Sequence, residues 1–127
     1  MNKDYEDGIE ILKEMTDVNG IQTIKNLGKI FPDFEEKMIS FGFGQIYSRS
    51  TLDLKTREIV TLTSLITQGA FEQLGFHIKA ALKAGLKSEE ILEIILHCAA
   101  YAGFPKACSA LVVAGEAFKG NDSNINR

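Results

Sequence analysis

The sequence has few cysteines, few prolines and no long hydrophobic run, and each shortage narrows the classes of protein it can encode. A helix that crosses a membrane needs about 20 consecutive apolar residues, and none of the apolar stretches in the 127 residues approaches that length. The opening residues, MNKDYED, are acidic and lack the apolar core of a secretion signal. We therefore expect a soluble cytoplasmic protein that is not bound to a membrane.

Basic residues are outnumbered, because 17 acidic side chains face 14 basic ones and give a net charge of -3. A nucleic-acid partner is not expected, since phosphate binding requires a basic surface. Apolar residues make up 45% of the chain and charged residues 24%, which is typical of a globular protein and excludes a disordered one. The length predicts a single domain over residues 1–127.

The two cysteines, Cys98 and Cys108, lie ten residues apart in alanine-rich sequence, and there is no Cys-x-x-Cys. This excludes a local redox pair or zinc knuckle and predicts two buried free thiols. The two histidines are not four residues apart, and no His-Glu-x-x-His, glycine-rich phosphate loop or Gly-x-Ser-x-Gly motif is present. We expect neither a metal nor an organic cofactor.

The pattern of apolar residues is helical throughout, with no convincing alternation of period two. The two prolines, Pro32 and Pro105, stand at apparent helix starts, where the missing N–H costs little. We expect an all-α bundle of about six to seven helices, with a break at Asn19-Gly20, helix caps at Asp33, Asp53 and Ser88, and two sub-blocks that meet near Asp53. The expected helices cover residues 5–16, 21–30, 33 to between 44 and 47, 53–68, 71–84, 88–102 and about 105–119.

Two of these helices each carry one ionisable residue away from the face that is expected to lie in solvent. Glu58 falls in the middle of the apolar stripe of helix 53–68, where a carboxylate is costly unless it is paired or protonated. A buried ion pair with Arg49 and a role as a general acid or base are about equally compatible with that position. His77 lies beside Gln73 and small alanines on helix 71–84, which suits either a structural hydrogen bond or proton transfer.

The helix over residues 89–102 is apolar over most of its circumference, which predicts a subunit interface in addition to the core. Its polar stripe contains Glu93, His97 and Tyr101. Glu93 and His97 have the spacing of an ordinary surface pair. The alternative is that His97 and Tyr101 line a cavity.

Three segments occur in order along the chain: LKTREIVTL at 54–62, the stretch from His77 through ALKAG at 81–85 to EEI at 89–91, and YAGFP at 101–105. Together they resemble the carboxymuconolactone decarboxylase family, which is related to alkyl hydroperoxidase D. The resemblance covers roughly residues 40–118. It implies the all-helical alkyl hydroperoxidase D-like fold and assembly into homotrimers or homohexamers.

The hydroperoxidase branch of this family carries Glu-x11-Cys-x-x-Cys-x-x-x-His. With Glu58 as the glutamate, the cysteine positions fall on Ala70 and Gln73 and the histidine on His77. A thiol peroxidase needs a thiolate nucleophile and a resolving thiol, and neither position supplies one. The sequence therefore lacks the residues that this redox chemistry uses. Two alternatives to a decarboxylase are an alkylhydroperoxidase or peroxiredoxin activity and a non-catalytic oligomeric protein.

The decarboxylase branch has the glutamate and the histidine without the cysteines. The resemblance to it implies a cofactor-independent carboxy-lyase that removes carbon dioxide from a small lactone carboxylate of the 4-carboxymuconolactone type in aromatic catabolism. We assign His77 as the proton donor and Glu58 as the group that orients or recharges it. Arg49 is expected to grip a substrate carboxylate, and His97 and Tyr101 to complete the pocket.

Glu58 and His77 are predicted to meet although they are 19 residues apart. The short turn at Gly69-Ala70 folds the second helix back along the first. At ~1.5 Å per residue, the two side chains stand ~16 and ~10 Å above that turn, a difference of about one helical turn. The alternative is that Glu58 pairs with Arg49 or Arg57 while His77 caps a carbonyl elsewhere.

Overall fold

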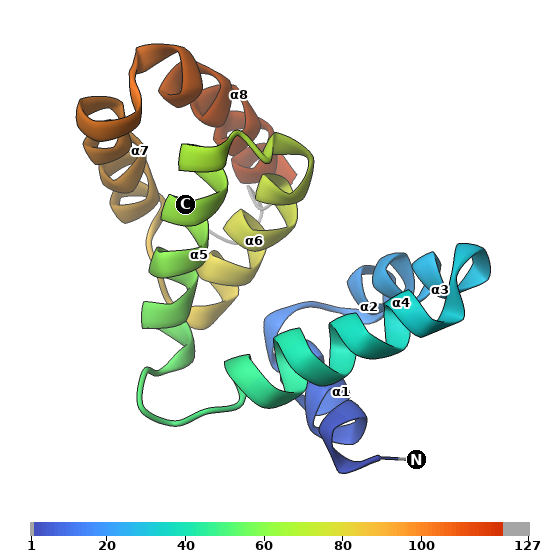
Figure 1. The fold of residues 1–127 in the computed structure, drawn as a ribbon. Coiled ribbons are helices and arrows are strands. Elements are labelled where there is room, and N and C mark those ends of the chain that lie inside the picture. The colour runs from blue at the N-terminus through green and yellow to red at the C-terminus, as the bar shows by residue number, and fades with distance from the viewer. Residues whose placement is uncertain (1, 121–127) are drawn as a thin grey trace. The chain divides into compact units, whose positions relative to one another are not determined.

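The computed structural model describes residues 2–120, and every regular element within that range is helical (Figure 1). The all-α fold predicted from the sequence is confirmed. None of the described helices is long and apolar enough to cross a membrane. The elements are α1 Lys3–Met15, α2 Val18–Lys25, α3 Leu27–Ile30, α4 Pro32–Lys37, the π-helix η1 Met38–Tyr47, α5 Leu54–Gln68, α6 Phe71–Ala84, α7 Ser88–Ala102 and α8 Phe104–Gly120.

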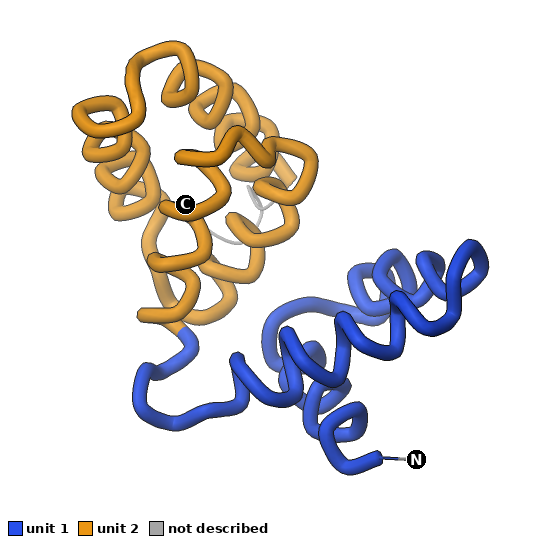
Figure 2. The backbone as a smooth tube through the Cα atoms, in the orientation of Figure 1, with its two compact units in different colours: residues 1–54 blue, residues 55–127 orange. Residues whose placement is uncertain are grey.

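The chain divides into two compact units, residues 1–54 and residues 55–127, which are coloured separately in Figure 2. We call them unit 1 and unit 2. The division falls after Leu54, next to Asp53, where the sequence predicts the meeting of two sub-blocks. That the whole chain forms a single domain stays a prediction.

Unit 1 is built on the close pairing of α1 with η1. Glycines make this approach possible, because a Cβ at Gly8 would overlap the carbonyl oxygen of Ile39, and a Cβ at Gly44 would overlap that of Asp4. The hydroxyl of Tyr5 on α1 donates a hydrogen bond of 2.6 Å to Glu35 on α4. Burial and this acceptor raise the pKa of Tyr5 to about 12.

The helix breaks in unit 1 differ from the sequence prediction. The predicted break at Asn19-Gly20 is wrong, because α1 ends at Met15 and Asp17 caps α2 by accepting a 2.9 Å hydrogen bond from the Gly20 amide. Asn19-Gly20 therefore forms the first turn of a helix. An aspartate that satisfies a free N–H of the first turn sets the helix start, even when a turn-favouring pair follows.

Two of the predicted caps are also displaced by one or two residues. The N-cap of α4 is Phe31, so Pro32 takes the first helical position and Asp33 lies inside the first turn. The N-cap of α7 is Lys87, whose amide donates a 2.8 Å hydrogen bond to the side chain of Glu90. A glutamate three residues into a helix thus caps it without Ser88.

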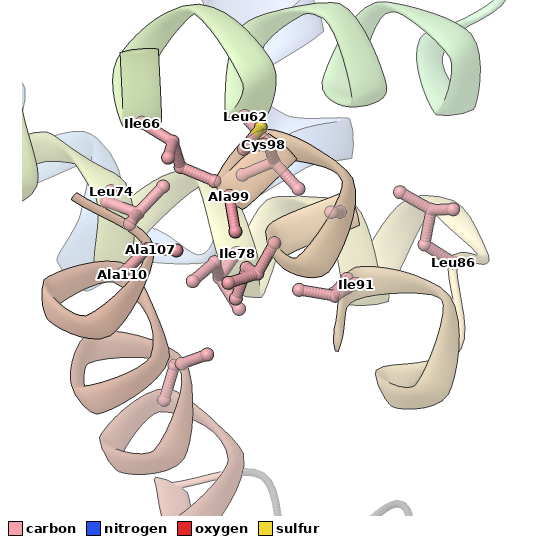
Figure 3. Packing of buried hydrophobic residues seen from close by; sticks show 14 residues of the cluster. Leu62, Ile66, Leu74, Ile78, Leu86, Ile91, Cys98, Ala99, Ala107 and Ala110 are labelled. Carbon is pink, nitrogen blue, oxygen red and sulfur yellow. The ribbon is translucent and has the colours of Figure 1, made fainter. Parts of the chain in front are cut away.

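Unit 2 contains helices α5 to α8 around one hydrophobic cluster (Figure 3). Helix α8 packs against α6 and α7 with a stripe of buried alanines, whose small side chains allow close approach. Gly85 ends α6 in the left-handed conformation, with φ 113°, which a glycine adopts without strain. The buried residues of the cluster are Leu62, Ile66, Leu74, Ile78, Ala81, Leu86, Ile91, Ile95, Cys98, Ala99, Ala107, Ala110, Ala114 and Ala117.

Candidate active site

Helix α5 carries Glu58 into the interior of the protein. Leu62 and Ile66 follow at intervals of four residues and are buried with it, so the three side chains share one face of the helix. Glu58 is 0% exposed. The sequence prediction that this carboxylate lies on a buried face is confirmed.

Helix α6 supplies the partner of Glu58, because Nδ1 of His77 lies 3.1 Å from Oε1 of Glu58. The short connection through Gly69, with φ 77°, joins α5 to α6 and allows the two residues to meet. The contact that the helix lengths predict is therefore present. We name this pair the Glu58–His77 dyad.

The two members of the dyad differ in their access to solvent. The His77 side chain is 14% exposed, whereas that of Glu58 is fully buried. A molecule that enters from solvent can therefore touch the imidazole but cannot touch the carboxylate. His77 is therefore the member of the dyad that can react with a substrate, and Glu58 can act only through His77.

The second oxygen of Glu58, Oε2, is buried and has no hydrogen-bond partner among the described residues 2–120. The hydrogen bonding of the carboxylate is consequently directed at the imidazole. When the Glu58 carboxylate is ionised it can only accept, and Nδ1 of His77 is then the donor in this contact. In the neutral ring this leaves Nε2 as an acceptor, and a protonated ring can donate its second proton from Nε2.

The two positions that hold redox cysteines in the hydroperoxidase pattern carry no thiol. Ala70 precedes α6, and Gln73 lies exposed one turn before His77 on the same helix. Residues one turn apart are neighbours on a helix surface. The surface beside His77 therefore offers an amide where the hydroperoxidase pattern has a sulfur.

The two cysteines of the chain lie on other helices, and their exposure differs. Cys98 on α7 is buried, as predicted, and burial raises the pKa of its thiol, with a hydrogen bond to Thr63 acting in the opposite direction. The prediction that Cys108 is buried is wrong. Cys108 follows Ala107 by one residue on α8, and this step turns it out of the buried alanine stripe.

The three residues predicted to bind substrate have different positions. Arg49 is exposed and belongs to unit 1. His97 and Tyr101 are exposed on α7, where their rings stack with centroids 5.4 Å apart and planes 8° apart. The binding role of all three stays a prediction.

A groove of about 550 Å³ runs along one side of α5, with the lining residues Ile59, Val60, Thr63, Ser64, Thr67 and Gln68. Most of these residues, such as Val60, Ser64 and Thr67, lie on the face of α5 that points away from Glu58, Leu62 and Ile66. The groove therefore does not open onto the dyad. Among residues 2–120 there is also no group of three metal-binding side chains that could hold an ion.

Comparison with known proteins identifies a family and several relatives. The sequence model of the carboxymuconolactone decarboxylase family matches residues 32–116. A 4-carboxymuconolactone decarboxylase from Acinetobacter baylyi is 33% identical over 116 residues, which cover 91% of this chain and 87% of the relative. The nitrosuccinic acid decarboxylase npaB from Metarhizium robertsii is 32% identical over 113 residues, or 86% of this chain and 77% of the relative.

A third relative is an uncharacterized 15.0 kDa protein in the nqo9-nqo10 intergenic region of Paracoccus denitrificans. It is 31% identical over 101 residues, which cover 78% of this chain and 75% of the relative. The similarity to all three relatives extends over most of each chain.

Proposed function

Because this chain belongs to the carboxymuconolactone decarboxylase family, we propose that it is a decarboxylase in which His77 donates a proton and Glu58 positions His77. The observation that carries the proposal is the 3.1 Å contact between Nδ1 of a partly exposed histidine and a fully buried carboxylate. Such a pair can protonate a carbanion without a metal or an organic cofactor.

The names of two relatives support a class of substrate. Nitrosuccinic acid and 4-carboxymuconolactone each combine a carboxylate with an electron-withdrawing group, a nitro group in one and a lactone in the other. Such a group can accept the electron pair that remains when carbon dioxide leaves. We propose a small lactone carboxylate of the 4-carboxymuconolactone type for this chain.

The reaction needs one bond to break and one to form. The bond between the substrate carbon and its carboxylate breaks, its electron pair moves into the electron-withdrawing group, and carbon dioxide leaves. Nε2 of the protonated His77 ring then gives its proton to the substrate carbon skeleton. Glu58 holds the ring through Nδ1 and stabilises its positive charge, and solvent returns the proton to Nε2.

Substrate carboxylates require a cation or hydrogen-bond donors. We propose that Arg49 supplies such a cation and that His97 and Tyr101 supply hydrogen-bond donors. We also propose a homotrimer or homohexamer. Support for assembly comes from the large apolar side chains exposed on α7 and α8, which are Leu92, Leu96, Tyr101, Phe104, Leu111 and Val112.

The proposed function is tested by supplying the purified protein with 4-carboxymuconolactone and measuring the release of carbon dioxide. We expect turnover, incorporation of one deuterium into the product in D2O, and a loss of about 100-fold or more in kcat for His77→Asn. Absence of carbon dioxide release at high enzyme concentration would reject this substrate. An unchanged kcat in His77→Asn would reject His77 as the proton donor.

A thiol peroxidase would need its cysteines for activity, whereas the proposed decarboxylase does not. Burial and a raised pKa make Cys98 a poor nucleophile, and Ala70 and Gln73 supply no thiol near His77. A Cys98→Ser, Cys108→Ser double variant should retain full decarboxylase activity. Rapid peroxide reduction that either single change abolishes would favour the peroxidase instead.

A further inference from the structure

The residue before His77 contacts the imidazole directly. The ring of Phe76 lies with its centroid 5.1 Å from that of His77, and the two planes are inclined by 70°. This is an edge-to-face arrangement within the favourable range for aromatic pairs. His77 is thus held by a carboxylate from α5 and by an aromatic ring from α6.

These two contacts restrict different motions of the imidazole. The imidazole moves by rotation about its Cα–Cβ and Cβ–Cγ bonds, and a single hydrogen bond at Nδ1 tolerates small combined rotations that would move Nε2 sideways. A neighbouring aromatic ring set at a steep angle opposes those rotations through van der Waals contact. Since proton transfer requires a donor within hydrogen-bond reach of the reacting carbon or its neighbours, the orientation of Nε2 affects the rate.

Phe76 is not used to build the core of unit 2. Phe71 and Phe118 pack against the buried cluster, whereas Phe76 is neither in that cluster nor among the partly buried residues that pack against it within the described part of unit 2. Phe76 is partly buried. The ring therefore contributes to the surroundings of His77 more than to the core.

We propose that Phe76 is a positioning residue that holds Nε2 of His77 in its reactive orientation, an inference that rests on the proposed role of His77 as proton donor. Phe76 does not itself touch the reacting atoms in this proposal. A leucine at this position would fill part of the space but would present no flat ring edge to the imidazole.

The test compares Phe76→Leu with Phe71→Leu, a matched control on the same helix that loses the same atoms from the core. Both variants should lower the melting temperature. Only Phe76→Leu should reduce kcat, by about 3- to 10-fold with KM changed less than 2-fold. Phe76→Tyr keeps the ring and should restore kcat to within 2-fold of the starting protein.

A second readout does not depend on activity. In protein labelled with ¹⁵N-histidine, at a pH where the ring is neutral, the His77 signals should report a proton on Nδ1, and a His97→Gln variant assigns them. Phe76→Leu should produce mixed tautomers or broadened signals, and Phe71→Leu and Phe76→Tyr should not. If Phe76→Leu leaves both kcat and these signals unchanged, Phe76 has no positioning role.

The two readouts separate failure of this inference from failure of the proposed function. If no lactone carboxylate is turned over, the decarboxylase proposal fails, and the ¹⁵N signals still decide whether Phe76 orders His77. If the enzyme is active and His77→Asn is inactive while Phe76→Leu behaves like Phe71→Leu, only the role of Phe76 is rejected.

Discussion

Replacing His77 with alanine should destabilise the protein far more than the loss of a partly exposed side chain would suggest. Glu58 is 0% exposed, its Oε1 lies 3.1 Å from His77, and its Oε2 has no hydrogen-bond partner within residues 2–120. His77→Ala therefore leaves a buried carboxylate without its hydrogen-bond donor. Breaking a buried pair in this way costs about 3–5 kcal/mol of unfolding free energy.

The complementary change, Glu58→Gln, should cost less. It removes the buried charge while leaving an amide that can still hydrogen bond to the ring, so we expect a loss of about 1–2 kcal/mol. The double variant Glu58→Gln, His77→Ala contains no buried charge that could be left without a partner. We therefore expect it to be more stable than His77→Ala alone, which is a coupling that two independent sites would not show.

The assay is urea unfolding at pH 7 followed by circular dichroism, with all variants at one protein concentration because any assembly links stability to concentration. Lys119→Ala serves as a control for an exposed ion pair. Lys119 lies 3.4 Å from Glu116 with both side chains more than 70% exposed, so its removal should leave the unfolding free energy unchanged.

Two results would refute the reasoning. One is a decrease of less than about 1 kcal/mol in the unfolding free energy of His77→Ala, which is below the expected cost of an unpaired buried charge. The other is a double variant no more stable than His77→Ala. The same proteins address the non-catalytic alternative, in which Glu58 is only structural and Glu58→Gln unfolds or dissociates the assembly. A folded, assembled Glu58→Gln protein with reduced kcat supports the enzyme.

Two further predictions concern packing and thiol chemistry. Gly44→Ala should lower the unfolding free energy by about 1–3 kcal/mol, because the added Cβ would overlap a backbone oxygen of α1. Gly42→Ala is the control on the same π-helix: its Cβ would meet nothing within 4 Å, so the change should be neutral or stabilising. Equal melting temperatures for the two variants would contradict this prediction. Alkylation of Cys98 at pH 8 should be much slower in the native protein than in denaturant, because burial and a raised pKa reduce the thiolate of Cys98. Equal rates of Cys98 modification in the native protein and in denaturant would count against its buried position.

The dyad could be predicted from the sequence because it depends on helix periodicity and on one short turn. Glu58 stands in register with Leu62 and Ile66, so any packing that buries those two side chains buries the carboxylate as well. The short link through Gly69 then returns the chain along α5, which brings His77 near Glu58. Both arguments depend only on the geometry of single helices and of one short turn, and the folded protein keeps that geometry.

The features that the sequence did not predict depend on contacts between distant segments. The pattern predicts a helix that ends between residues 44 and 47, but the π-helical form of Met38–Tyr47 is not visible in it. That segment packs against α1, where Gly8 and Gly44 allow the two backbones to approach closely. A π-helix has poor intrinsic stability and persists where tertiary packing favours it, so propensity alone could not identify it.

The division of roles within the dyad also depends on tertiary structure. A helical wheel places Glu58 and His77 on inward or flanking positions, but it does not distinguish 0% from 14% exposure of their side chains. That difference determines which of the two groups a substrate can reach. It follows that a substitution of His77 should act on proton transfer itself, whereas substitutions of Glu58 or Phe76 should act through the charge and orientation of the imidazole. The three residues are therefore best separated by the pH dependence of kcat and by the state of the His77 ring, and not by loss of activity alone.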